Sequence, residues 1–152
     1  MTADVNLVAI ADALSALQVS GVNVRDIDQI PENATNIVPV FFPIPNGFIT
    51  DMVWERETFG ADTVAKMNLT YVLHYRYLHA PIGSGGGLLA VYAGLIKNLV
   101  KILQAIFADS NLSGEVVDVS LNGISDIGAL PDPAGNPFHG VDITLKVLEY
   151  IQ

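Results

Sequence analysis

The stretch from Met67 to Leu78, MNLTYVLHYRYL, decides the fold because its polar side chains all fall on one of two alternating sets of positions. One set of alternate positions is wholly apolar or aromatic: Met67, Leu69, Tyr71, Leu73, Tyr75 and Tyr77. The other set contains all four polar side chains of the stretch, together with two apolar ones: Asn68, Thr70, Val72, His74, Arg76 and Leu78. Alternate residues of a strand point to opposite faces of its sheet. Such a long alternation predicts a strand of an antiparallel sheet that buries one face, because parallel strands buried on both faces are apolar throughout.

Downstream of this strand, a glycine run, Gly83–Gly87, precedes an apolar segment that predicts one long helix over about 88–108. The segment is apolar around most of its circumference, and its narrow polar stripe consists of Lys97, Lys101 and Gln104. About twenty apolar residues are enough to cross a bilayer. Two lysines near the middle would each cost a few kcal/mol there, and the sequence has no second span. We therefore expect a helix packed within protein, and no membrane partner.

Upstream of the strand, the sequence predicts a helix, a short strand and an extended segment. The helix has its apolar positions on one face, at Leu7, Ile10, Leu14 and Leu17. The alternating segment 22–27 favours a short strand. Because three prolines interrupt Val38–Pro45, we expect an edge strand or an extended segment there.

A turn at Asn46-Gly47 starts the next strand. Strict alternation would place two sets of side chains on opposite faces: Phe48, Thr50, Met52 and Trp54 on one, and Ile49, Asp51, Val53 and Glu55 on the other.

Two further alternating segments, 117–121 and 141–147, predict strands after the long helix. Between them, Gly128–Gly140 is rich in proline and glycine and predicts a long stiff loop. Strands grouped before and after a helix indicate the α+β class. We expect an antiparallel or mixed sheet of about five strands, packed by the N-terminal helix and the long helix, in a single domain over residues 1–152.

The composition restricts the classes of partner. Sixteen acidic and seven scattered basic residues give a formal net charge of −9, whereas nucleic-acid binding needs clustered Lys and Arg. The chain has no cysteine, and its N-terminus lacks the basic start and apolar run of a signal peptide, so we expect a protein kept in the cytoplasm. The apolar share is 51% and the charged share only 15%, which suggests that a partner covers some apolar surface.

No catalytic constellation emerges from the sequence. The Gly83–Gly87 run lacks the Lys-Ser/Thr end of a phosphate loop and the spacing of a dinucleotide fingerprint. The histidines lack the spacing of a zinc site, the acidic group Asp51, Glu55 and Glu57 lacks an opposed carboxylate, and no serine has a nucleophile-elbow context. We therefore expect neither an enzyme nor a cofactor.

Two features instead favour assembly with other subunits. One sheet covers only one stripe of a helix, so the rest of the apolar surface over 88–108 needs a second surface, either the N-terminal helix or another subunit. A long proline-stiffened loop suits docking, because less conformational entropy is lost when it binds. The candidate interface residues are Arg76, Tyr92, Lys97, Lys101, Gln104, Asp132, Asn136, Phe138 and His139.

The order of elements resembles that of the tail terminator (tail completion) proteins of long-tailed bacteriophages. The resemblance is one of pattern and covers Leu7–Leu17, Val38–Leu78, Leu88–Ala108 and Val116–Tyr150. It implies a homo-oligomeric ring, typically of six subunits, that caps the tail tube and joins it to the head. The implied partners are the tail tube protein and a head-completion or connector protein, within a virion assembled in the host cytoplasm. Genome DNA would pass through the lumen without specific binding, which agrees with the acidic charge.

Two alternatives stay open from the sequence. One is another phage neck or tail tube subunit, although such proteins usually have more strand and a shorter helix. The other is a small ligand-binding domain that uses the Gly83–Gly87 loop.

Overall fold

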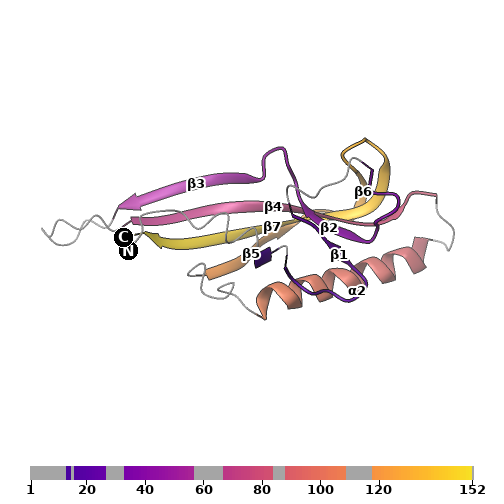
Figure 1. Ribbon diagram of the computed structural model, residues 1–152, viewed down its shortest axis with the longest axis horizontal. Coiled ribbons are helices and arrows are strands. Elements are labelled where there is room, and N and C mark those ends of the chain that lie inside the picture. Colours follow the sequence, from indigo (N-terminus) through magenta and orange to yellow (C-terminus); the bar gives the residue numbers. More distant parts are fainter. Residues whose placement is uncertain are drawn as a thin grey trace, which may run out of the picture.

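The computed structural model of the chain describes residues 13–14, 16–26, 33–56, 67–83, 88–108 and 118–151. Within these ranges the fold is α+β, as predicted, with one long helix against a mixed sheet (Figure 1). The elements are β1 (Asn23–Val24), β2 (Val40–Pro43), β3 (Ile49–Arg56), β4 (Met67–Pro81), α2 (Leu88–Phe107), β5 (Asp118–Ile124), β6 (Gly128–Pro131) and β7 (Pro137–Ile151).

Two long antiparallel strands, β4 and β7, form the centre of the sheet and pair along their whole length. The outer edge of β4 carries β3 along its first half and β2 along its second half, and β1 adds to β2 in parallel. The outer edge of β7 carries β5 and β6 in the same manner. The described part of the sheet thus has seven strands where the sequence suggested about five. The short strand expected over 22–27 is present as β1, and β6 was not expected because its four residues are too few to show alternation.

The helix-side face of the sheet carries the main core, and its buried residues are those that the alternation of Met67–Leu78 predicted. Leu69, Tyr71, Leu73, Tyr75 and Tyr77 of β4 are each at most 3% exposed. Alternate residues of β7, from Val141 to Val147, continue this face, and α2 packs on it. In Figure 1, α2 lies along one half of the sheet, and the ends of β3, β4 and β7 project beyond it.

A second, smaller core covers the opposite face of the sheet near β2 and β6. It contains Ala34, Val40, Phe42, Leu78 and Phe138. In this region Gly140 of β7 lies too close to β4 for any side chain, because an added Cβ would collide with the backbone carbonyl oxygen of Tyr77. This second core ties the β6–β7 connection to the segment before β2.

Three local predictions were wrong, each for a physical reason. The segment Gly128–Gly140 is not one loop but a hairpin, because β6 and the start of β7 pair from Gly128↔Gly140 to Pro131↔Pro137. β2 is not an edge strand, because it pairs with β1 on one side and with β4 on the other. Pro43 is its last residue, and Pro39 lies just before it. The prolines therefore leave the middle of β2 free to pair on both sides.

The third correction concerns the faces of β3. A bulge between Thr50 and Val53 inserts an extra residue, with Asp51 at a positive φ of 54°. The alternation therefore changes phase, as a bulge requires. Ile49 and Trp54 pair with Leu73 and Leu69 and share the helix-side face, whereas the sequence placed them on opposite faces.

The predicted long helix is confirmed as α2. Most of the N-terminal helix expected over Leu7–Leu17 lies outside the described residues. Within that range Ala13 and Leu14 are helical, and Leu14 is buried in the main core.

Candidate functional site

The long helix α2 buries one row of apolar side chains and exposes another. Leu95, Leu99, Ile102 and Ile106 pack on the sheet and are at most 7% exposed. A second row, spaced by seven, four and seven residues, lies on one flank of the helix. Its members are Leu89 (86% exposed), Ile96 (48%), Val100 (47%) and Phe107 (37%). The prediction that one sheet leaves part of the helix uncovered is therefore confirmed within the subunit.

The helix also passes the length and hydropathy test for a membrane span over Leu89–Phe107. This is weak evidence, because core helices of soluble proteins pass the same test. The fully buried row shows that α2 packs on the sheet of its own subunit. The exposed row is thus a lateral surface of a packed helix.

The polar contacts of α2 show the direction in which the exposed row faces. Asn98 donates to the hydroxyl of Tyr77 on β4 at 2.9 Å, and Lys101 donates to the carbonyl of Ser20 at 3.4 Å. Asn98 and Val100 are two residues apart, so they project from opposite flanks of the helix. Since Asn98 faces β4, the exposed row faces the side of β7 and β5. Lys97 and Gln104 are exposed beside the row.

The neighbouring edge strand β5 adds two exposed apolar residues to this side. Leu121 (42% exposed) and Ile124 (40%) pair with Leu145 and Ile143 of β7 and therefore share the helix-side face. We call these two residues and the exposed row of α2 the helix-side strip: Leu89, Ile96, Val100, Phe107, Leu121 and Ile124.

A second apolar surface lies on the opposite edge of the sheet, on β3. Met52, Val53 and Trp54 are each 46–48% exposed, and the exposed acids Asp51 and Glu55 bracket them. We call this segment, Asp51–Glu55, the β3 patch. The β3 patch was not predicted, although the sequence has three consecutive large apolar residues between two acids, followed by a polar connection.

Two of the predicted interface residues, Tyr92 and His139, pack edge-to-face inside the subunit with ring centroids 5.5 Å apart. Nearby, the hydroxyl of Tyr77 lies 2.6 Å from Nδ1 of His79. Burial raises the pKa of Tyr77 to about 12. Burial, followed by the charge of His139, lowers the pKa of His79. These side chains join α2 to β4 and β7. The Nδ1 atom of His139 is buried and has no hydrogen-bond partner among the described residues.

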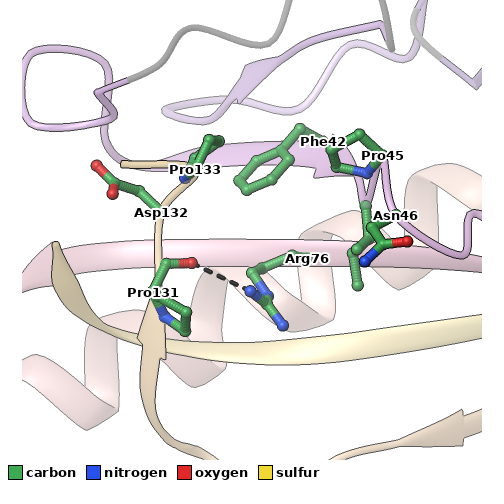
Figure 2. A pocket seen from close by; sticks show the side chains of 8 residues that line it. Phe42, Pro45, Asn46, Arg76, Pro131, Asp132 and Pro133 are labelled. Carbon is green, nitrogen blue, oxygen red and sulfur yellow. Dashed lines mark hydrogen bonds between the residues drawn. The ribbon is translucent and has the colours of Figure 1, made fainter. Parts of the chain in front are cut away.

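Arg76 and Asp132, two further predicted residues, line a pocket of about 370 Å³ on the other face of the sheet (Figure 2). Arg76 makes a two-bond ion pair with Asp142, at 2.7 and 3.0 Å, and donates to the carbonyl of Pro131 at 3.1 Å. The walls are apolar and stiff: Phe42, Ile44, Pro45, Pro131 and Pro133. Because Asp142 neutralises Arg76, the floor of the pocket offers no net positive charge to an anion.

Asp132 stabilises the turn between β6 and β7. Its carboxylate accepts from the backbone N–H of Ala34 at 3.0 Å and from the backbone and side chain of Asn136 at 2.8 and 3.1 Å. Burial alone would raise its pKa, but these hydrogen bonds outweigh burial and hold the pKa below its usual value. Phe138 is 1% exposed in the second core. Asp132 and Phe138 therefore make their contacts within the subunit, while Asn136 is exposed.

The residues considered for chemistry are dispersed. Nε2 of His74 lies 2.6 Å from the hydroxyl of Thr50 on the opposite face of β4 from Tyr77. Among the described residues, no group of three or more His, Asp or Glu side chains is arranged to hold a metal ion. Of the Gly83–Gly87 run, Gly83 is described and has a φ of 90°, and the other four residues lie outside the described ranges.

The described residues thus expose two groups of apolar side chains, the helix-side strip on α2 and β5 and the β3 patch on β3. The chain matches no protein-family model, and no curated protein sequence matches it.

Proposed function

We propose that this chain is the subunit of a homo-oligomeric ring, of about six copies, at the head-proximal end of a bacteriophage tail tube. In that position the ring ends tail growth and joins the tail to the head. The proposal combines the resemblance in element order with the surface properties of the fold.

The observation that carries the proposal is the exposed apolar row of α2. Leu89, Ile96, Val100 and Phe107 line one flank of a helix whose other apolar row is already buried. Burial of apolar surface contributes roughly 25 cal/mol per Å², so covering this flank favours association with another protein surface. A structural subunit that functions only when assembled has a use for such a flank.

The charge of the chain supports the same role. The formal net charge is −9, and the described basic residues do not form a cluster on one element beyond Lys97 and Lys101. A ring with acidic walls lets DNA pass without holding it, since binding to phosphate requires a concentration of positive charge.

The experiment that tests the proposal is polymerisation of the tail tube protein encoded in the same genome, with and without this chain. We expect addition of the chain to stop tube growth and to place a ring on one end of each tube in electron micrographs. Incorporation all along the tube would instead favour a tube subunit. Bare tube ends and unchanged tube lengths would refute the proposal.

A further inference from the structure

The chain contains two Asn-Gly dipeptides, Asn46-Gly47 and Asn122-Gly123, and the fold places them in contrasting environments. Asn46-Gly47 lies in the turn between β2 and β3, and both of its residues are exposed. Asn122-Gly123 lies within β5, which pairs with β7. A glycine has no side chain to shield its backbone nitrogen, so that nitrogen can approach the side-chain amide of a preceding asparagine. The surroundings of each dipeptide then decide whether this approach takes place.

The turn at Asn46-Gly47 is held on both sides but not at its tip. Ile44 donates its backbone N–H to the carbonyl of His74, and the carbonyl of Phe48 accepts from the N–H of His74, both at 2.9 Å. Between these two bonds, neither the side-chain amide of Asn46 nor the N–H of Gly47 has a hydrogen-bond partner among the described residues. Gly47 has a φ of 80°, and a Cβ added there would meet no atom within 4 Å beyond its chain neighbours. The tip of the turn therefore has room to rearrange.

Asn122-Gly123 is restrained by its partner strand. The side-chain amide of Asn122 donates to the hydroxyl of Thr144 at 3.3 Å, and that hydroxyl donates to the carbonyl of Gly123 at 3.1 Å. Gly123 also pairs with Thr144 in the sheet, and a Cβ added at Gly123 would lie 3.4 Å from the same hydroxyl oxygen. A reaction that bends the backbone at Asn122 must first open these contacts locally.

We propose that Asn46 is a site of spontaneous deamidation in the folded protein, and that β5 protects Asn122 from the same reaction. The backbone nitrogen of Gly47 attacks Cγ of Asn46 and closes a succinimide ring. The bond from Cγ to the side-chain nitrogen breaks, and ammonia leaves with the proton that the backbone nitrogen loses. Water then adds to one carbonyl carbon of the ring, the bond from that carbon to the nitrogen breaks, and the backbone N–H is restored.

The two carbonyl carbons of the ring give two products. Attack of water at Cγ leaves an aspartate in an unaltered backbone. Attack at the main-chain carbonyl carbon leaves an isoaspartate, in which the backbone runs through the former side chain of Asn46. Each product adds one carboxylate to the lining of the pocket that contains Arg76 and Asp132 (Figure 2). Since Arg76 is already paired with Asp142, the pocket becomes more negative. The reaction occurs within one subunit and does not depend on the ring function proposed above.

Mass spectrometry of peptides, after incubation of the full chain at mildly alkaline pH, measures both sites in one sample. In urea both dipeptides are unrestrained, so we expect similar rates at Asn46 and Asn122. In the folded protein we expect Asn46 to react at least about tenfold faster than Asn122, because β5 must open before Asn122 can react. Equal rates at the two sites of the folded protein, or a faster rate at Asn122, would overturn the proposal.

Two matched variants assign the product to its site. Isoaspartate in the folded chain is quantified by enzymatic methyl transfer from S-adenosylmethionine. Asn46→Gln should remove most of this signal, since glutamine would have to close a larger ring, whereas Asn122→Gln should leave it unchanged. A signal that Asn46→Gln leaves unchanged, or that Asn122→Gln removes, would place the reaction elsewhere and overturn the proposal.

Discussion

Several single residues in this fold connect segments that are distant in the sequence through side-chain hydrogen bonds. Asp132 is the clearest case, since its carboxylate holds the N–H of Ala34 across 98 positions and organises the turn to Asn136. The sequence placed Asp132 in a stiff docking loop, because a run of prolines and glycines does not disclose the hairpin pairing around it. Only the long-range hydrogen bond identifies its role within the subunit.

Replacing Asp132 by Ala should destabilise the fold by about 1–3 kcal/mol, because two backbone N–H groups lose a buried charged acceptor. Since the pKa of Asp132 is lowered on folding, its contribution is present above the unfolded value, near 4, and is lost as the pH falls through the folded value. Urea unfolding at neutral pH measures the loss. An unfolding free energy for Asp132→Ala equal to that of the unaltered chain would contradict this role.

His79 provides a second, separate dependence on pH. Its pKa is lowered on folding by burial and by His139, so folding favours the neutral imidazole. The resulting stability is present above the unfolded pKa, near 6.5, and is lost as the pH falls through the lower folded value. We expect the urea midpoint to decrease between about pH 7.5 and pH 5, and to decrease less in His79→Gln. An identical decrease in both proteins would assign the pH dependence to other groups.

At the scale of elements, alternation and helical periodicity were sufficient wherever one face of an element is buried. They identified the central strand β4, its buried face and the bounds of α2. They failed at β3, because a bulge at Asp51 reverses which side chains face the helix. The spacing of apolar residues in the sequence does not reveal this bulge. They also failed at β6, whose four residues are too few for a periodic signal. The excess apolar surface of α2 was predicted from its periodicity. The β3 patch was not predicted, although its three consecutive apolar residues between two acids are visible in the sequence.

The two apolar rows of α2 should respond differently to truncation. Ile102→Ala removes a fully buried side chain and should cost about 2–5 kcal/mol of stability. Val100→Ala, two residues away, should change the stability of the monomer by less than about 0.5 kcal/mol, because Val100 is 47% exposed. Val100→Ala should nevertheless weaken self-association.

Chemical denaturation of dilute monomer and sedimentation of concentrated protein measure these two effects separately. If Val100→Ala lowered monomer stability as much as Ile102→Ala, the exposed row would belong to the core of the subunit. If neither variant changed self-association, the row would have no role in assembly.

At the scale of the whole molecule, the described residues form an elongated sheet with α2 along part of one face (Figure 1). The exposed apolar row lies on α2, whereas the β3 patch lies near the end of β3, where the sheet projects beyond the helix (Figure 1). The arrangement follows from pairings between residues far apart in the sequence, and single-sequence patterns do not carry that information.

The most direct test of the ring is cryo-electron microscopy of tail tubes capped with this chain. We predict a closed ring with rotational symmetry at one tube end, in which another protein surface covers the exposed apolar row of α2. A tube end without a ring, or a ring in which that row faces solvent, would contradict the account.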